Sequence, residues 1–249
     1  MRAHYVIAAL AAALTLSVVE APAADLKVTS TTALKTVLEE LGPQFEKATE
    51  TKLVTTIGPT AVLKTQIDQG AAFDVAFLTV AATDDLAKQG KIIADTRATI
   101  AHAGIGVAIR KGAPKPDIST TEAFKRTLLN AKSIGYTAQG ASAGALQAIF
   151  VKLGIADELK SKIKLLDGPA GPAVANGEVE LGMTQISEIL PYADDQLVGP
   201  LPPEVQTYTT FSAGVASGSA QPDAARALIK FLTAPAALPV IKAKGLEPG

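Results

Sequence analysis

The sequence predicts an α/β protein of two lobes, each with a mostly parallel β-sheet flanked by helices. Short apolar runs of β-type residues alternate with segments whose apolar residues recur at helical spacing. This alternation stops at a loop with two prolines, Lys111–Ser119, and starts again after it. Two long β-type runs, near residues 100–109 and 205–215, flank the second block. We expect them to be the two hinge crossings between the lobes.

The first block alternates strands with helices, which favours a parallel sheet covered on both faces. Leu34, Val37, Leu38 and Leu41 form one apolar helix face, and Gly90 ends the last helix. The predicted order is strand Leu26–Ser30, helix Leu34–Phe45, strand Leu53–Ile57, helix Thr60–Gln69, strand Asp74–Leu78 and helix Ala81–Gln89.

The second block repeats this alternation. Its predicted order is helix Thr120–Asn130, strand Ser133–Thr137, helix Ser142–Leu153, strand Ile163–Leu166, helix Gly171–Asn176 and strand Leu181–Thr184. Ser119 or Thr120 is the expected N-cap of the first of these helices. The Pro-rich run Gly199–Pro203 reads as a breaker that ends the block.

The C-terminal part contains one strand, Thr207–Val215, and two helices, Pro222–Leu232 and Pro235–Lys244. These helices have no sheet of their own, so we expect them to return to the first block. The predicted division is residues 25–104 with 206–249 in lobe 1, and residues 105–205 in lobe 2.

The N-terminus has the pattern of a signal peptide, predicted over residues 1–24. Arg2 and His4 precede an apolar run, Val6–Val19, which is shorter than the roughly 20 residues of a membrane-spanning helix. Ala21-Pro22-Ala23 supplies the small residues of a cleavage site. We therefore expect export to the periplasm, and a lipoprotein is excluded because the chain has no Cys.

Composition excludes several function classes. The 23 Lys and Arg nearly balance the 24 Asp and Glu, without the basic excess of a nucleic-acid binder. After removal of the leader, His102 is the single His, so we expect no metal and no cofactor. Gly140–Gly144 fits the G-x-S-x-G pattern of serine hydrolases, but no His follows it, as that fold would require.

Small polar residues gather where predicted strands end and helices begin. Ligands of open α/β sheets bind at the carboxyl ends of the strands, and helix N-termini attract anions. The sequence therefore predicts an anion site between the lobes, although ordinary helix capping would favour the same residue types. The candidate ligand-binding residues are Thr31, Thr32, Thr60, Thr79, Gln139, Ser142, Ala143 and Gln185.

Three stretches, Ala33–Phe45, Leu63–Asp74 and Asn176–Gly182, resemble periplasmic substrate-binding proteins of the molybdate-binding type, which serve ABC transporters. The resemblance implies the type II periplasmic-binding-protein fold, a small anion between the lobes, and a membrane permease as partner. We expect a monomer. At positions where molybdate-binding members place their contacts, this chain has Ala33, Thr60 and Gln185, and its polar residues suit a larger, carboxylate-bearing ligand.

Two further stretches, GAPKPDIST and QISEILP, resemble the branch of this family that includes a periplasmic aconitate isomerase. That resemblance implies an alternative function, in which a base in the same cleft moves an allylic proton. His102 and Glu188 are both candidates for that base, and binding without catalysis remains the first hypothesis.

Overall fold

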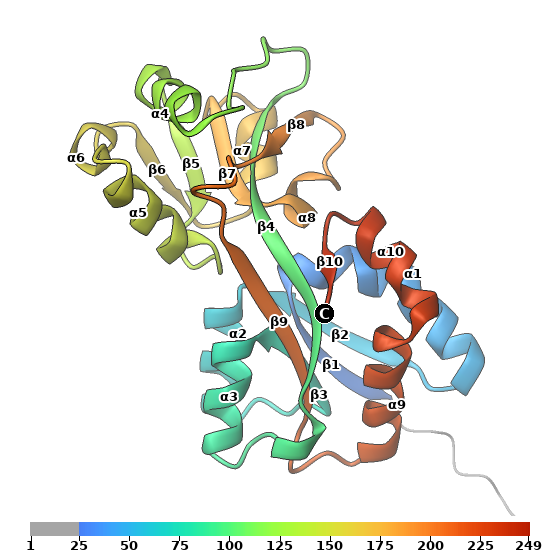
Figure 1. Cartoon of the computed structure of the whole chain (residues 1–249). Helices are drawn as coiled ribbons and strands as arrows, with labels where there is room; N and C mark the ends of the chain where they lie inside the picture. The colour runs from blue at the N-terminus through green and yellow to red at the C-terminus, as the bar shows by residue number, and fades with distance from the viewer. Residues whose placement is uncertain (1–24) are drawn as a thin grey trace, which may run out of the picture.

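The computed structural model describes residues 25–249, so the predicted signal peptide, residues 1–24, lies outside the described residues. The chain forms two lobes joined by two long strands, β4 (Ala98–Arg110) and β9 (Tyr208–Val215), which run from one lobe toward the other (Figure 1). The two-lobed α/β architecture predicted from the sequence is therefore confirmed.

The first lobe contains a sheet of three parallel strands, β2 (Leu53–Gly58), β1 (Leu26–Thr31) and β3 (Val75–Thr79). β9 pairs antiparallel with β3, and the first half of β4 pairs antiparallel with β9, so β4 runs in the same direction as the three parallel strands. The C-terminal β10 (Glu247–Pro248) adds a short pairing to β4.

Helices cover both faces of this sheet, as Figure 1 shows. One face packs against α1 (Lys35–Thr49), α9 (Pro222–Thr233) and α10 (Leu238–Ala243), around Phe45, Phe77 and Phe211. The other face packs against α2 (Thr60–Asp68) and α3 (Val80–Lys88). The C-terminal helices thus return to the first lobe.

The second lobe is built on the other half of β4. The sheet order in this lobe is β8 (Asp195–Pro200), β4, β7 (Leu181–Gln185), β5 (Ile134–Thr137) and β6 (Ile163–Leu166). Within β4, the residues Ile105–Ile109 pair antiparallel with β7, and β8 pairs on the opposite side of β4.

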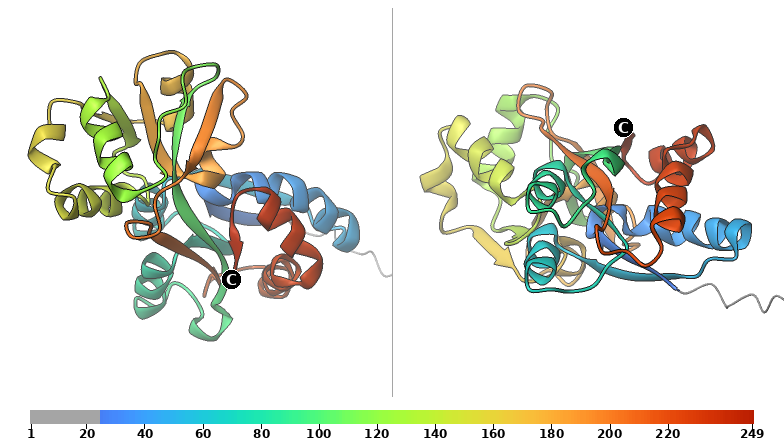
Figure 2. Two further views of the ribbon diagram at one scale, coloured as in Figure 1. Left: turned by 45° about the horizontal axis from the view of Figure 1, so that its top comes forward. Right: turned by 90° about the horizontal axis from the view of Figure 1, so that it is seen from below.

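Helices flank the second sheet (Figure 2). Side chains of β4 alternate between the two faces: Ile105, Val107 and Ile109 join one core cluster, and Ala108 joins the other. The first face carries α4 (Thr121–Asn130), α5 (Ala143–Lys152) and α6 (Ala156–Leu159), and the second carries α7 (Ala170–Ala175) and α8 (Ile186–Ile189).

Most predicted elements lie within one or two residues of their observed bounds, and two expectations need refinement. Thr120, rather than Ser119, caps α4, because its Oγ1 accepts the Ala123 N–H at 3.1 Å. The interpretation of Gly199–Pro203 as a breaker is partly wrong, because Gly199 and Pro200 end β8. β8 is an edge strand, where a proline leaves no ladder hydrogen bond unmade.

Strand β4 changes its pairing partner at one point, where it passes from the first lobe into the second. Up to Gly104 the strand pairs with β9, and from Ile105 onward it pairs with β7. The Gln206 side chain spans this point: its Oε1 accepts the Ile105 N–H at 3.0 Å and its Nε2 donates to the Ile105 carbonyl at 2.9 Å. The two crossing strands are thereby fastened together where the lobes meet.

No single helix in residues 25–249 is long and apolar enough to cross a membrane, and only the pair α9 and α10, bent by 57°, reaches that length together.

Candidate functional site

A cavity of about 380 Å³ lies between the two lobes. It opens where strands β1 and β2 of one lobe and β5 and β6 of the other reach their carboxyl ends, which is the expected ligand position in this class of fold. The lobe 1 wall consists of Thr31, Thr32, Lys35, Ile57, Gly58 and Pro59, and the lobe 2 wall of Thr137, Gly140, Ala141, Asp167, Gly168, Pro169, Glu188 and Tyr192.

The lobe 1 wall is formed by the turn from β1 into a 3-10 helix, η1 (Thr32–Leu34). Thr31 is nearly fully buried, whereas Ala33 and Leu34 turn inward and join the apolar core of the lobe. Lys35 then begins α1 at the cavity. This turn brings threonine residues and one ammonium group to the same wall.

Two loops of the second lobe form the opposite wall. Thr137 ends β5, and its Oγ1 donates a hydrogen bond to the Gly168 carbonyl at 2.9 Å. This bond ties the loop before α5 to the loop before α7. Pro169 is the N-cap residue of α7, so the chain turns from the cavity directly into that helix.

Glu188 is the acidic group on α8 at this cavity. The Thr184 hydroxyl donates to Glu188 Oε2, and no other hydrogen bond or ion pair to this carboxyl occurs within residues 25–249. Burial raises the pKa of Glu188, and the Thr184 hydrogen bond opposes that shift. The carboxyl is therefore poised to hold a proton closer to neutrality than an exposed glutamate would.

Tyr192 lies in the segment after α8 and completes this part of the wall. A side chain at Gly171 would overlap the Tyr192 ring, so the glycine allows the ring to lie against α7. Burial raises the pKa of Tyr192, and the charges of Glu188 and Asp195 raise it further. The Tyr192 hydroxyl is therefore a neutral hydrogen-bonding group.

The lobes contact each other around the cavity. Ala141, from the loop before α5, packs against the apolar cluster of lobe 1. The Gly245 turn of lobe 1 lies against α8, because a side chain there would reach Ile186 Cγ2 within 2.7 Å and Leu190 Cδ1 within 2.8 Å. The two lobes therefore touch each other at the edges of the cavity.

The predicted ligand-binding residues lie at different places relative to the interlobe cavity. Thr31 and Thr32 line the cavity. Thr60 begins α2 directly after Pro59, and its buried Oγ1 has no hydrogen-bond partner within residues 25–249. Ser142 and Ala143 are buried next to Ala141 at the start of α5, and Gln139 is exposed on the same loop.

Like Thr60, Gln139, Ser142 and Ala143, the predicted residues Thr79 and Gln185 do not line the cavity. Thr79 caps α3, with its Oγ1 accepting the Ala82 N–H at 3.4 Å. Gln185 is fully buried, and its Nε2 donates to Thr209 Oγ1 at 3.5 Å. The candidate base His102 lies on β4, where its Nδ1 is 2.9 Å from Thr210 Oγ1, and it is absent from the cavity wall.

Sequence reasoning missed several wall residues. Asp167, Gly168 and Pro169 follow a predicted strand, so the rule used for the other strand ends would have found them. No such pattern pointed to Lys35 or Tyr192, because neither residue directly follows a predicted strand. Tertiary packing brings these two side chains to the cavity.

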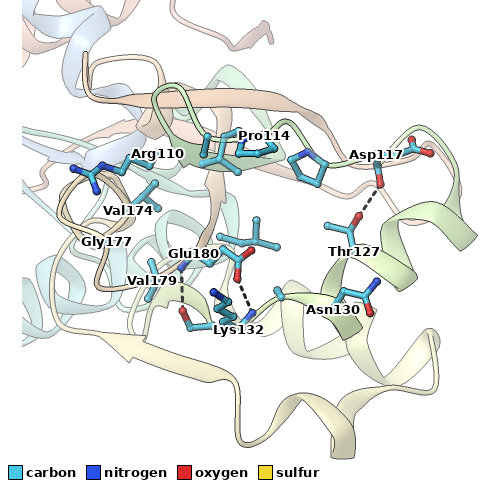
Figure 3. A pocket seen from close by; sticks show the side chains of 16 residues that line it. Arg110, Pro114, Asp117, Thr127, Asn130, Lys132, Val174, Gly177, Val179 and Glu180 are labelled. Carbon is cyan, nitrogen blue, oxygen red and sulfur yellow. Dashed lines mark hydrogen bonds between the residues drawn. The ribbon is translucent and has the colours of Figure 1, made fainter.

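A second pocket of about 610 Å³ lies within lobe 2, next to the residues that precede β5 and β7 (Figure 3). Its polar groups are largely engaged with one another: Glu180 Oε2 accepts the Lys132 N–H at 2.6 Å, and Thr127 Oγ1 donates to the Asp117 carbonyl at 2.7 Å. Of these two cavities, the interlobe one is built by both lobes, so we take it as the candidate functional site.

The sequence matches a family model described as bacterial extracellular solute-binding protein over residues 26–247. The chain belongs to this family. It is 31% identical over 233 residues to an aconitate isomerase of a Pseudomonas species, covering 91% of this chain and 89% of that protein. It is also 31% identical over 239 residues to the molybdate-binding protein ModA of Azotobacter vinelandii, covering 90% of each.

The solved structure of the periplasmic molybdate-binding protein of Azotobacter vinelandii has the same fold, with a TM-score of 0.78 and 23% identity. The match covers 90% of this chain and all of that chain (100%). The sulfate-binding protein SubI of Mycobacterium tuberculosis matches with a TM-score of 0.74 and 16% identity, covering 90% of this chain and 86% of that chain. The type II periplasmic-binding-protein fold predicted for this family member is therefore confirmed.

Proposed function

We propose that the protein captures a small anion between its two lobes in the periplasm and delivers it to a membrane ABC permease. The observation that carries this proposal is the interlobe cavity, which combines the hydroxyls of Thr31 and Thr32 with the Lys35 ammonium group. Solute-binding relatives named for molybdate support an anion as the ligand. The protein acts as a monomer after removal of residues 1–24.

The change of β4 partners supports a division at residue 104/105, with the return crossing at 205/206. Lobe 1 then comprises residues 25–104 and 206–249, and lobe 2 comprises residues 105–205. Closure about these crossings would bring the two walls of the cavity together around the ligand.

A thermal-shift screen tests anion capture, with molybdate, tungstate, sulfate, phosphate, citrate and both aconitates as probes. A ligand at 100 times its Kd stabilises the folded state by about 2.7 kcal/mol. At about 2–4 °C per kcal/mol, the melting temperature then rises by several degrees. The absence of a shift with every anion contradicts the proposal.

A pair of lysine variants on α1 tests the position of the site. Lys35→Gln removes the cation from the cavity, and we expect about fivefold weaker anion binding, because the ammonium group is half-exposed and solvent screens it. Lys47→Gln, near the other end of the same helix, is the control and should bind as the parent protein does. Equal affinities for all three proteins would place the ligand elsewhere.

A second candidate function is the interconversion of cis- and trans-aconitate in the same cavity. Glu188 favours it, because a half-buried carboxyl with a raised pKa suits proton transfer near neutral pH. The base removes a proton from the methylene carbon, the C–H electrons form the new double bond, and the electrons of the old one take a proton at its far carbon. The similarity to an aconitate isomerase supports this candidate.

Proton NMR of cis-aconitate with the protein tests this second function. We expect the trans isomer to appear with the parent protein, and Glu188→Gln to bind aconitate without forming it. If no trans isomer accumulates with the parent protein, the isomerase function is wrong for this substrate, while anion capture stands.

A further inference from the structure

Glu188 presents a difficulty for anion binding, because it brings a second negative charge to the cavity. Its carboxyl accepts one hydrogen bond, from Thr184, and pairs with no cation within residues 25–249. A carboxylate and an anion bound beside it repel each other, and more strongly in a protein cavity than in bulk water. A proton between them removes this repulsion and replaces it with a hydrogen bond.

The surrounding charges do not neutralise Glu188. Of the elements packed against α8, the segments η1, α7 and β7 contain no titratable residue. On β4, His102 is bonded to Thr210, and Arg110 lies opposite Asp195 of β8. Lys244, beside the Gly245 turn that contacts α8, pairs with Glu40 at 2.6 Å.

Three titratable groups share the cavity wall with Glu188: Lys35, Asp167 and Tyr192. Lys35 lies 3.6 Å from Glu39 and is half-exposed, so it attracts an anion without forming an ion pair with Glu188. Asp167 adds negative charge, and Tyr192 is neutral at physiological pH. The charge of Glu188 is therefore left without a paired cation, and an anion bound next to it needs a proton between the two.

We propose that Glu188 is a specificity-determining residue, which makes the cavity bind an anion together with one shared proton. This inference rests on the proposed capture of an anion, and a Glu188 that keeps the shared proton is not the base of the isomerase candidate. A ligand such as hydrogen phosphate, or a partly protonated polycarboxylate, brings the proton itself. Sulfate, molybdate or a fully ionised tricarboxylate requires Glu188 to be protonated and to donate.

The affinities of these two classes of ligand should depend differently on pH. Above the pKa of Glu188, binding of a fully ionised anion takes up one proton, so its affinity falls about tenfold per pH unit. Hydrogen phosphate already carries the proton, so its affinity stays level over the same range. Burial raises the pKa of Glu188, which moves this difference toward neutral pH.

Isothermal titration calorimetry in buffers of different ionisation enthalpy measures the protons taken up on binding. At pH 8, we expect close to one proton per bound sulfate, molybdate or citrate with the parent protein, and none with hydrogen phosphate. Glu188→Gln always offers an amide donor, so it should take up no proton with any of these anions. Asp167→Asn, which alters the other carboxyl of the wall, tests whether the proton belongs there. Glu122→Gln, in the exposed first turn of α4 and outside the wall, is the control and should take up as many protons as the parent protein does.

The outcomes separate the two proposals. If the parent protein binds a fully ionised anion at pH 8 without taking up a proton, or if Glu188→Gln takes up as many protons as the parent, the role of Glu188 is wrong and anion capture stands. If Asp167→Asn alone abolishes the uptake, the proton belongs to Asp167 and the proposal is overturned. If none of these anions binds the parent protein, the proposed function itself fails, and the inference fails with it.

Discussion

At the scale of single residues, the second lobe contains a buried acid without a partner. Asp195 begins β8 and is only 8% exposed, and neither carboxylate oxygen has a hydrogen-bond partner within residues 25–249. Burial raises the pKa of Asp195 to about 6, and the charge of Asp194 acts in the same direction. Between about pH 4 and pH 6, Asp195 therefore carries a proton in the folded protein that it has already lost in the unfolded chain.

Asp195→Asn should stabilise the protein above pH 6. The folded pKa lies above the unfolded one, so the contribution of Asp195 to stability is complete below about pH 4 and is lost as the pH rises toward 6. The neighbours Asp194 and Gln196 are exposed, so solvent screens part of the effect, and we expect a gain of about 1–2 kcal/mol at pH 7. Urea unfolding at pH 4 and pH 7 measures it; an equal gain at both values would contradict a titration of Asp195.

At the scale of elements, one aspartate connects two strands and a helix. Asp74, directly before β3, is buried; its Oδ2 accepts the Lys27 N–H of β1 at 2.8 Å. Its Oδ1 accepts the Ser219 hydroxyl at 2.7 Å and the Ala220 N–H at 3.2 Å, in the turn before α9. One side chain thus fixes the returning C-terminal helix to the first lobe.

Asp74→Ala should destabilise the protein by about 2–4 kcal/mol, because it leaves buried donors without an acceptor. Asp223→Ala, in the exposed first turn of α9, is the control and should cost less than about 1 kcal/mol. Denaturant unfolding followed by circular dichroism checks both variants. Equal losses for the two would mean that the Asp74 hydrogen bonds contribute little.

Helices and strands were predictable from the sequence where the local residue preferences agree with the packing of the folded chain. Helix α3 follows the strand that ends at Thr79 and stops before Gly90, whose positive φ of 73° suits glycine. Strand β8 was missed, because Gly199 and Pro200 resemble a loop in any sequence window. Only its position at the edge of the sheet makes that proline compatible with a strand.

At the scale of the whole molecule, small contacts join the two lobes beside the cavity. Ala141 of lobe 2 packs on the apolar cluster of lobe 1 and also lines the cavity. We therefore expect closure of the lobes around a ligand to bury this methyl group. A charge at this position would oppose closure without disturbing either core.

Ala141→Asp should weaken sulfate or citrate binding by about 5- to 100-fold, because a carboxylate would lose its water on closure at a cost of about 1–3 kcal/mol. Small-angle X-ray scattering should record a larger radius of gyration for this variant in the presence of the anion. Ala138→Asp, exposed on the same loop, is the matched control. Parent-like affinity in Ala141→Asp would mean that this contact does not stabilise the bound form.

The class of fold follows from the sequence alone, because the alternation of apolar strands and amphipathic helices is a local pattern. The same pattern predicted a site at the carboxyl ends of the strands, and Thr31 and Thr32 line the interlobe cavity there. The tertiary structure was needed to show that Glu188 lines this cavity and His102 does not, and that Gln185 lies beside Thr209. The reason is that a cavity between two lobes is built from residues far apart in the chain, and its members are selected by packing.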